Sequence, residues 1–150
     1  MTDEEVKTAI KDIIATACPA AVIWPYNVLS HQLAEWPALF RKADSTVEGW
    51  MIMRTRIDAH WKNTSREKAT WHYTILGFYG FRTGKEGDNS DDEFAVKLDA
   101  IRAGFKAAPT LEIECVEKHD LLQVAANTTI DCGEETLHLA NCSLAVHVCD

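Results

Sequence analysis

Two segments of the chain carry apolar residues at helical spacing. Each opens on a capping-box pattern, in which Thr2 or Ser90 is followed three residues later by glutamate. Apolar residues then recur every three or four positions, which places them on one face of a helix. Each pattern stops at a proline, Pro19 or Pro109, because proline cannot continue the hydrogen bonding of a helix. The sequence therefore predicts two amphipathic helices.

Apolar and polar residues alternate over residues 48–61 and again over residues 69–81. Such alternation is typical of a strand that buries one face. The polar segment Asn63–Glu67 lies between the two and predicts the turn of an antiparallel hairpin. A second hairpin is expected near the end of the chain, with strands at 121–131 and 136–148.

The segments between these elements are shorter or less regular. Residues 20–24 predict a short strand that Pro25 ends, whereas residues 27–46 fit no single pattern. Strand pairs that are segregated from two helices are typical of an α+β domain. We therefore expect a single domain over residues 1–150, with a mainly antiparallel sheet of about five strands and two helices packed on one face.

Charge narrows the range of partners. The chain has 23 acidic and 15 basic residues, a formal net charge of −8. A phosphate-binding surface needs clustered Lys and Arg, so we expect no direct nucleic-acid partner. The acidic start Met1–Glu5 is unlike a signal peptide, and no apolar run approaches the ~18 residues of a membrane span. We expect no membrane association and folding in a bacterial-type cytoplasm.

The common catalytic and phosphate-binding sequence motifs are incomplete in this chain. Gly80–Glu86 looks like a phosphate-binding loop, but Tyr79 occupies the place of its first glycine and Glu86 that of its Ser or Thr. Neither Ser30–His31 nor His119–Asp120 has a third group at a recognised spacing. We therefore expect no catalytic residue, no cofactor and no enzymatic activity.

Metal binding is a weaker alternative. The chain has five cysteines, and none is paired at the two-residue gap of a zinc or redox motif. The end of the chain is nevertheless rich in Cys132, His138, Cys142, His147 and Cys149. Successive residues of a strand point to opposite faces, so His138 and Cys142 would lie on one face and His147 and Cys149 on the other, and one ion cannot bind ligands on both faces. We expect thiols that act as small apolar side chains, and no metal site.

The long hairpin has apolar residues on parts of both faces, and two helices can cover only one face of a sheet. The other face would then form a contact surface for another protein. The candidate interface residues are Trp50, Ile52, Arg54, Arg56, Leu76 and Phe78. Arg54 and Arg56 are two residues apart, so they are expected to share the face of the strand that carries the tryptophan and the isoleucine. In the alternative, residues 27–46 fold over this face.

Four stretches of the chain form a recognisable set. They are Phe40–Asp44 running into Gly49–Thr55, then Gly77–Phe81, then Asp91–Phe105 with its Pro109–Leu111 end, and finally Leu137–Val148. This set resembles the tail terminator family of long-tailed bacteriophages and prophages. The resemblance implies a structural α+β subunit that forms a homo-hexameric ring. The ring would cap the tail tube, end its polymerisation and contact the head–tail connector protein, in the host bacterial cytoplasm during assembly and later in the virion tail.

Two further hypotheses stay open. The first is a small-molecule-binding or hydrolytic α+β domain with its site under residues 27–46. The second is a zinc-dependent interaction module built on the C-terminal cysteines. The Gly- and Asp-rich loop Thr83–Asp92 is expected to be mobile in the isolated subunit and to become ordered on assembly.

Overall fold

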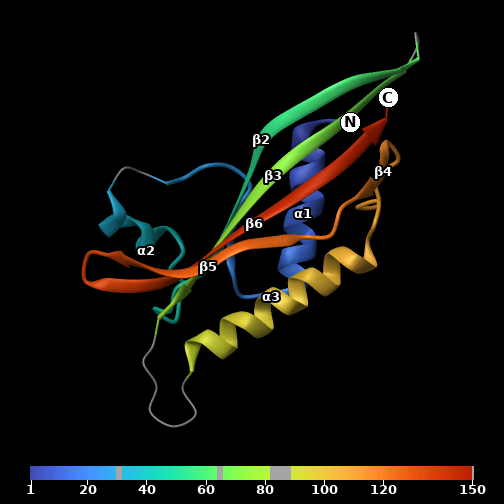
Figure 1. Cartoon of the computed structure of the whole chain (residues 1–150). Helices are drawn as coiled ribbons and strands as arrows, with labels where there is room; N and C mark the ends of the chain where they lie inside the picture. Colours follow the sequence, from blue (N-terminus) through green and yellow to red (C-terminus); the bar gives the residue numbers. More distant parts are fainter. Residues whose placement is uncertain (30–31, 64–65, 82–88, 150) are drawn as a thin grey trace.

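The α+β fold of the computed structural model is built on a mixed sheet of six strands with three α-helices among the described residues. These residues are 1–29, 32–63, 66–81 and 89–149. The sheet is flanked on both sides: helices α1 and α3 lie on one side of the long strands, and the segment with α2 lies on the other (Figure 1). None of the described helices is both long enough and apolar enough to cross a bilayer.

Three long antiparallel strands form the centre of the sheet. They are β2 (Glu48–Asn63), β3 (Arg66–Gly80) and β6 (Glu135–Cys149), side by side in that order. On the outer side of β6, β5 (Gln123–Cys132) pairs with its first part and β4 (Val116–His119) with its last part. At the other edge, the short β1 (Val22–Trp24) pairs with the beginning of β2.

The predicted sheet was right in class and differs in detail. The expected strands at 20–24, 48–61, 69–81, 121–131 and 136–148 are all present, with shifted ends. β1 is parallel to β2, since the chain crosses from one to the other through residues 25–47, so the sheet is mixed rather than purely antiparallel. β4 is an additional strand, whose four residues are too few to show an alternating pattern.

The two predicted helices are α1 (Asp3–Ala17) and α3 (Ser90–Ala107), which cover one face of the sheet. The capping box of Thr2 with Glu5 is confirmed. The second capping box is wrong, because Asn89 caps α3 through its side-chain oxygen and Ser90 is already helical. The predicted apolar stripe of α3 is buried; it consists of Phe94, Leu98, Ile101 and Phe105.

The opposite face of the sheet is covered by the irregular segment that follows β1. A 3-10 turn (Leu33–Glu35) runs into the short α2 (Trp36–Leu39), and Phe40 then lies flat on Phe78 with ring centroids 4.6 Å apart. Gly49 makes this contact possible, because a Cβ at that position would overlap the Phe40 ring. The alternative in which residues 27–46 fold over the second face is therefore confirmed.

A β-bulge in β2 changes which side chains face the helices. Arg54 pairs with Tyr73, but the next paired residue is Arg56, opposite His72, so Thr55 is the extra residue. Before the bulge, even-numbered residues face α1 and α3; after it, odd-numbered residues such as Ile57 do so. The sequence does not show this change, because before the bulge it has apolar residues at both even and odd positions, Trp50 and Ile52 as well as Met51 and Met53.

Candidate assembly surfaces and a charged pocket

The residues predicted to form an exposed interface are mostly internal. Trp50 and Ile52 are buried under α1 and α3, with 1% and 0% of their surface exposed. Phe78 is also fully buried, and Leu76 packs beside it, but on the opposite face of the sheet. The expectation that one face presents these residues outward is therefore wrong. Helices α1 and α3 cover one face and the segment with α2 covers the other. Trp50, Ile52 and Phe78 are therefore not available to a partner in this conformation.

Arg54 belongs to the monomer's own structure. Its guanidinium lies 4.9 Å from the centre of the Trp71 ring and its Nη1 lies 3.7 Å from Asp3 Oδ1. The Tyr73 hydroxyl donates a hydrogen bond of 2.9 Å to the same carboxylate oxygen of Asp3. Burial raises the pKa of Tyr73 above its usual value, so this hydroxyl stays protonated as the donor. Arg54 thus helps to anchor the start of α1 to the sheet.

Arg56 points to the opposite face from Arg54, so the expectation that both arginines share one face is wrong. The bulge at Thr55 is the reason. The side chain of Arg56 is 64% exposed, and its Nη2 lies 3.0 Å from Asp58 Oδ2. His72 also contacts Asp58 at 2.9 Å, and this hydrogen bond holds the pKa of Asp58 below its usual value. Of the two arginines, Arg56 is the more accessible to a partner, since the side chain of Arg54 is only 30% exposed.

The outer edge of β5 has no strand partner in the part of the chain that the structure describes. All residues from Gln123 to Thr129 are exposed, so neither face of this segment is covered. The ten residues from Leu121 to Ile130 carry no charge, although charged residues are the usual means by which proteins block an open edge. β5 is therefore an open and uncharged edge of the sheet, with a bulge between Val124 and Ala126.

The second open edge belongs to β2. β1 pairs with Gly49–Met51 only, and beyond this segment the outer side of β2 has no strand partner among the described residues. Residues Thr55 to His60 are exposed in succession. This half of β2, with the facing half of β3, extends away from the short segment that β1 covers (Figure 1). The sheet thus ends in an open strand edge on each side.

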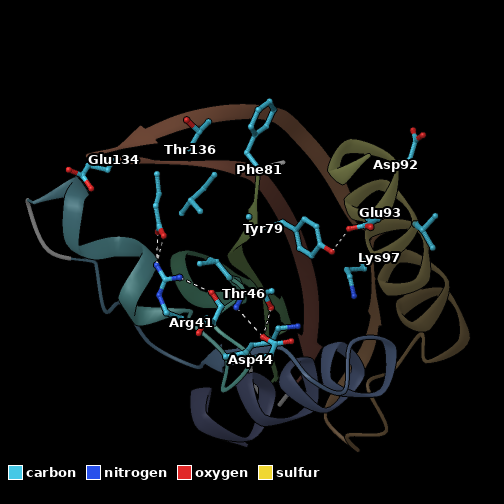
Figure 2. Close-up of a pocket in the computed structure, with 17 residues that line it drawn as sticks. Arg41, Asp44, Thr46, Tyr79, Phe81, Asp92, Glu93, Lys97, Glu134 and Thr136 are labelled. Carbon is cyan, nitrogen blue, oxygen red and sulfur yellow. Dashed lines mark hydrogen bonds and ion pairs between the residues drawn. The ribbon is translucent and has the colours of Figure 1, made fainter. Parts of the chain in front are cut away.

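A cavity of about 1060 Å³ lies between the hairpin of residues 41–47, the start of α3 and the β5–β6 turn. Figure 2 shows Arg41 and Thr46 on one side of it, and Glu93 and Lys97 from α3 on the other. Arg41 is held by both carboxylate oxygens of Glu135, at 2.7 and 2.6 Å. The charged lining residues are Arg41, Lys42 and Lys97, with Asp44, Asp92, Glu93, Glu134 and Glu135.

Two lysines of this lining share a buried carboxylate. Glu48 is 2% exposed, and its two oxygens lie 2.9 Å from Lys42 Nζ and 3.0 Å from Lys97 Nζ. The three residues come from β2, the preceding hairpin and α3, so this charge cluster joins three parts of the fold. The sequence offered no sign of it, because Lys97 is far from Glu48 along the chain.

Ser90, His138 and Asp91 have the contacts of a hydrolase triad. Ser90 Oγ lies 2.8 Å from His138 Nε2, and His138 Nδ1 lies 3.1 Å from Asp91 Oδ1. However, Ser90 is 1% exposed, so a substrate cannot reach its hydroxyl. The first N–H groups of α3, which would stabilise an oxyanion, are bonded to Asn89 instead. We interpret this cluster as a connection between the start of α3 and β6.

This connection predicts a pH dependence of stability. Burial lowers the pKa of His138 below its usual value, and the Asp91 carboxylate opposes this shift only in part. The unfolded chain therefore binds a proton more readily than the folded protein below about pH 6.5. The contribution of His138 to the free energy of unfolding is fully present above that pH. It is lost as the pH falls through the lower pKa that His138 has in the folded protein. We expect the free energy of unfolding to decrease between pH 7 and pH 5.

Urea denaturation at several pH values measures this dependence. The variant His138→Gln should show a flatter pH profile than the wild type, because it has no proton to gain at this position. His60→Gln removes an exposed histidine and serves as the matched control. Equal pH profiles for the wild type and His138→Gln would contradict the prediction.

The cysteines contribute apolar side chains. Cys18, Cys132 and Cys142 are buried. Burial raises the pKa of the Cys142 thiol to about 12 and that of Cys18 to about 11, with a smaller effect of Glu48 on the second. Among the described residues, no group of three or more His, Cys, Asp or Glu side chains has the geometry of a metal site.

Other predicted features have a structural role or lie outside the description. His119 is buried at the end of α3, where its Nε2 contacts the carbonyl oxygens of Phe105 and Ala108 at 2.8 and 2.9 Å. Ser30 and His31 lie outside the described residues, as does most of the Thr83–Asp92 loop and of the segment that looks like a phosphate-binding loop.

A comparison of the chain with protein-family models and with curated proteins found no match.

Proposed function

We propose that this protein is a structural, non-enzymatic subunit that assembles with copies of itself into a ring of the phage tail terminator type. The observation that carries the proposal is the pair of open strand edges, β5 on one side of the sheet and the second half of β2 on the other. A subunit with a different open edge on each side can bind one neighbour through each edge. Repetition of such a contact gives a closed ring when the rotations from each subunit to the next add up to a full turn.

The resemblance of residues 40–148 to the tail terminator family supplies the biological context for this geometry. In that context the ring is a homo-hexamer that caps the tail tube, ends its polymerisation and contributes to the head–tail joint. Its partners are further copies of the chain, the tail tube protein and the head–tail connector protein. This role requires contact surfaces rather than reactive groups, and the exposed backbone of β5 provides such a surface.

Light scattering over a wide range of protein concentration tests the proposal. We expect self-association that increases with concentration and is strengthened by tail tube protein, with rings visible by electron microscopy. A protein that stays monomeric at high concentration, with and without tube protein, would contradict the proposal. The cavity beside residues 41–47 would then favour the alternative, a small-molecule-binding or hydrolytic α+β domain with its site under residues 27–46.

A further inference from the structure

We infer that neighbouring subunits join head to tail, with β5 of one copy pairing with the free half of β2 of the next copy. This inference rests on the proposed self-assembly and names the surfaces that carry it. Main-chain hydrogen bonds between two exposed strand edges would continue the sheet from one subunit into its neighbour. The argument has three parts, which concern strand direction, the position of the free edges and charge.

The directions of the strands suit this contact. β2 is antiparallel to β3, β3 is antiparallel to β6, and β6 is antiparallel to β5, so β5 and β2 run in opposite directions. A second copy placed beside the first in the same orientation therefore presents its β2 antiparallel to β5. Antiparallel pairing is the slightly more stable form, and the helices of both copies stay on the same side of the continued sheet.

The free edges occupy opposite ends of the sheet. The exposed segment Thr55–His60 of β2 lies beside Lys68–His72 of β3, at one end of the sheet. β5 pairs with the first part of β6, which lies beside Thr74–Gly80 of β3, at the other end. β1 covers the edge of β2 at the level of β5, and β4 occupies the outer side of β6 at the other level. Neighbouring copies must therefore be displaced along the strands, which inclines each subunit relative to the next.

Charge favours this pairing over pairing of like edges. The β2–β3 arm, defined as residues 54–63 and 66–71, has five basic and two acidic residues, a net charge of +3 in a chain of −8. Two of these cations, Arg54 and Lys68, pair with Asp3 and Glu117 outside the arm. The uncharged segment of β5 lies between Asp120 on one side and Asp131 and Glu134 on the other. Two arms facing each other would repel, and an antiparallel pair of β5 strands would bring Asp120 close to Asp131 of the second copy.

Two substitutions that change the charge of the strand edges test the contact. Asn127→Lys places a cation on the exposed middle of β5, and Arg56→Glu places an anion on the exposed middle of the β2 edge. Each should weaken self-association about tenfold or more, as measured by sedimentation, because like charges then face each other or the acidic flanks of β5. The double variant, which places opposite charges on the two edges, should regain association.

Matched controls separate charge from folding. Asn127→Asp changes the same exposed position in the opposite direction and should keep or strengthen association. Circular dichroism melting should be nearly unchanged in every variant, because both side chains are exposed and exposed ion pairs such as Arg56–Asp58 contribute little to stability.

Each other outcome overturns the inference in a recognisable way. If Asn127→Lys blocks association in the presence of either residue at position 56, the contact is a two-fold pairing of β5 with β5. If only Arg56→Glu has an effect, two β2 edges meet. If neither has an effect while the wild type still assembles, the contact lies on another surface and the proposed function survives. A wild type that is monomeric with and without tube protein overturns both.

Discussion

Replacement of Glu48 by glutamine is expected to lower the free energy of unfolding by about 3 kcal/mol. Glu48 is 2% exposed and neutralises two ammonium groups at 2.9 and 3.0 Å. Without its charge, Lys42 and Lys97 would repel each other across a buried amide. Removing one partner from a buried ion pair usually costs about 3–5 kcal/mol, and the partial exposure of both lysines argues for the lower end of that range.

Thermal and urea denaturation measure this effect. For a chain of this size, a loss of about 3 kcal/mol lowers the melting temperature by roughly 6–12 °C. Glu134→Gln removes the same charge from an exposed position and is the matched control, with an expected change within about 0.5 kcal/mol. If both variants lose the same stability, Glu48 does not hold the three parts of the fold together.

Phe78→Ala is expected to destabilise the isolated subunit by about 3–5 kcal/mol. The Phe78 ring is fully buried between Phe40, whose ring centroid lies 4.6 Å away, and Trp36, whose ring centroid lies 5.9 Å away in a T-shaped arrangement. Truncation would leave a cavity between the sheet and the segment that covers its second face. The cost appears in the folding of each subunit, whether or not it assembles, because these contacts lie within one chain.

Urea denaturation at a concentration where the protein is monomeric measures the loss as a lower midpoint with an unchanged slope. The control is Ile57→Ala, which truncates an apolar side chain that is 45% exposed and should change stability within about 0.5 kcal/mol. The opposite pattern, in which Phe78→Ala folds normally and only fails to assemble, would return Phe78 to the interface. The two buried sites together therefore test whether the sheet is covered on both faces.

The proposed assembly uses features that these two substitutions do not touch. Glu48 binds α3 on one face of the sheet and Phe78 packs against the segment on the other face. The open edges lie at the two sides of the sheet, away from both contacts. A destabilised subunit can therefore be distinguished from one that has lost its contact surface. Edge variants should melt normally and fail to associate, and core variants should melt early.

The sequence by itself determined the elements whose pattern is local. The capping box at Thr2 and the apolar spacing after it identify α1, and the stripe from Phe94 to Phe105 identifies α3. The alternation in β2, β3 and β6 was equally visible, because side chains of neighbouring residues leave a strand in opposite directions. The uncharged segment Leu121–Ile130 is also a property of the sequence, although its importance depends on the edge that it occupies.

The tertiary structure alone decided which apolar face is covered and by what. Residues 27–46 have no periodic pattern, and their packing over Phe78 results from a parallel crossover between β1 and β2 that no local signal specifies. A single extra residue, Thr55, moved Arg56 to the other face from Arg54, since every later side chain changes sides at a bulge. Lys97 reaches Glu48, and Ser90 reaches His138, only because α3 folds back onto the sheet. Contacts between distant segments depend on the arrangement of whole elements, and the local spacing of residues does not contain that information.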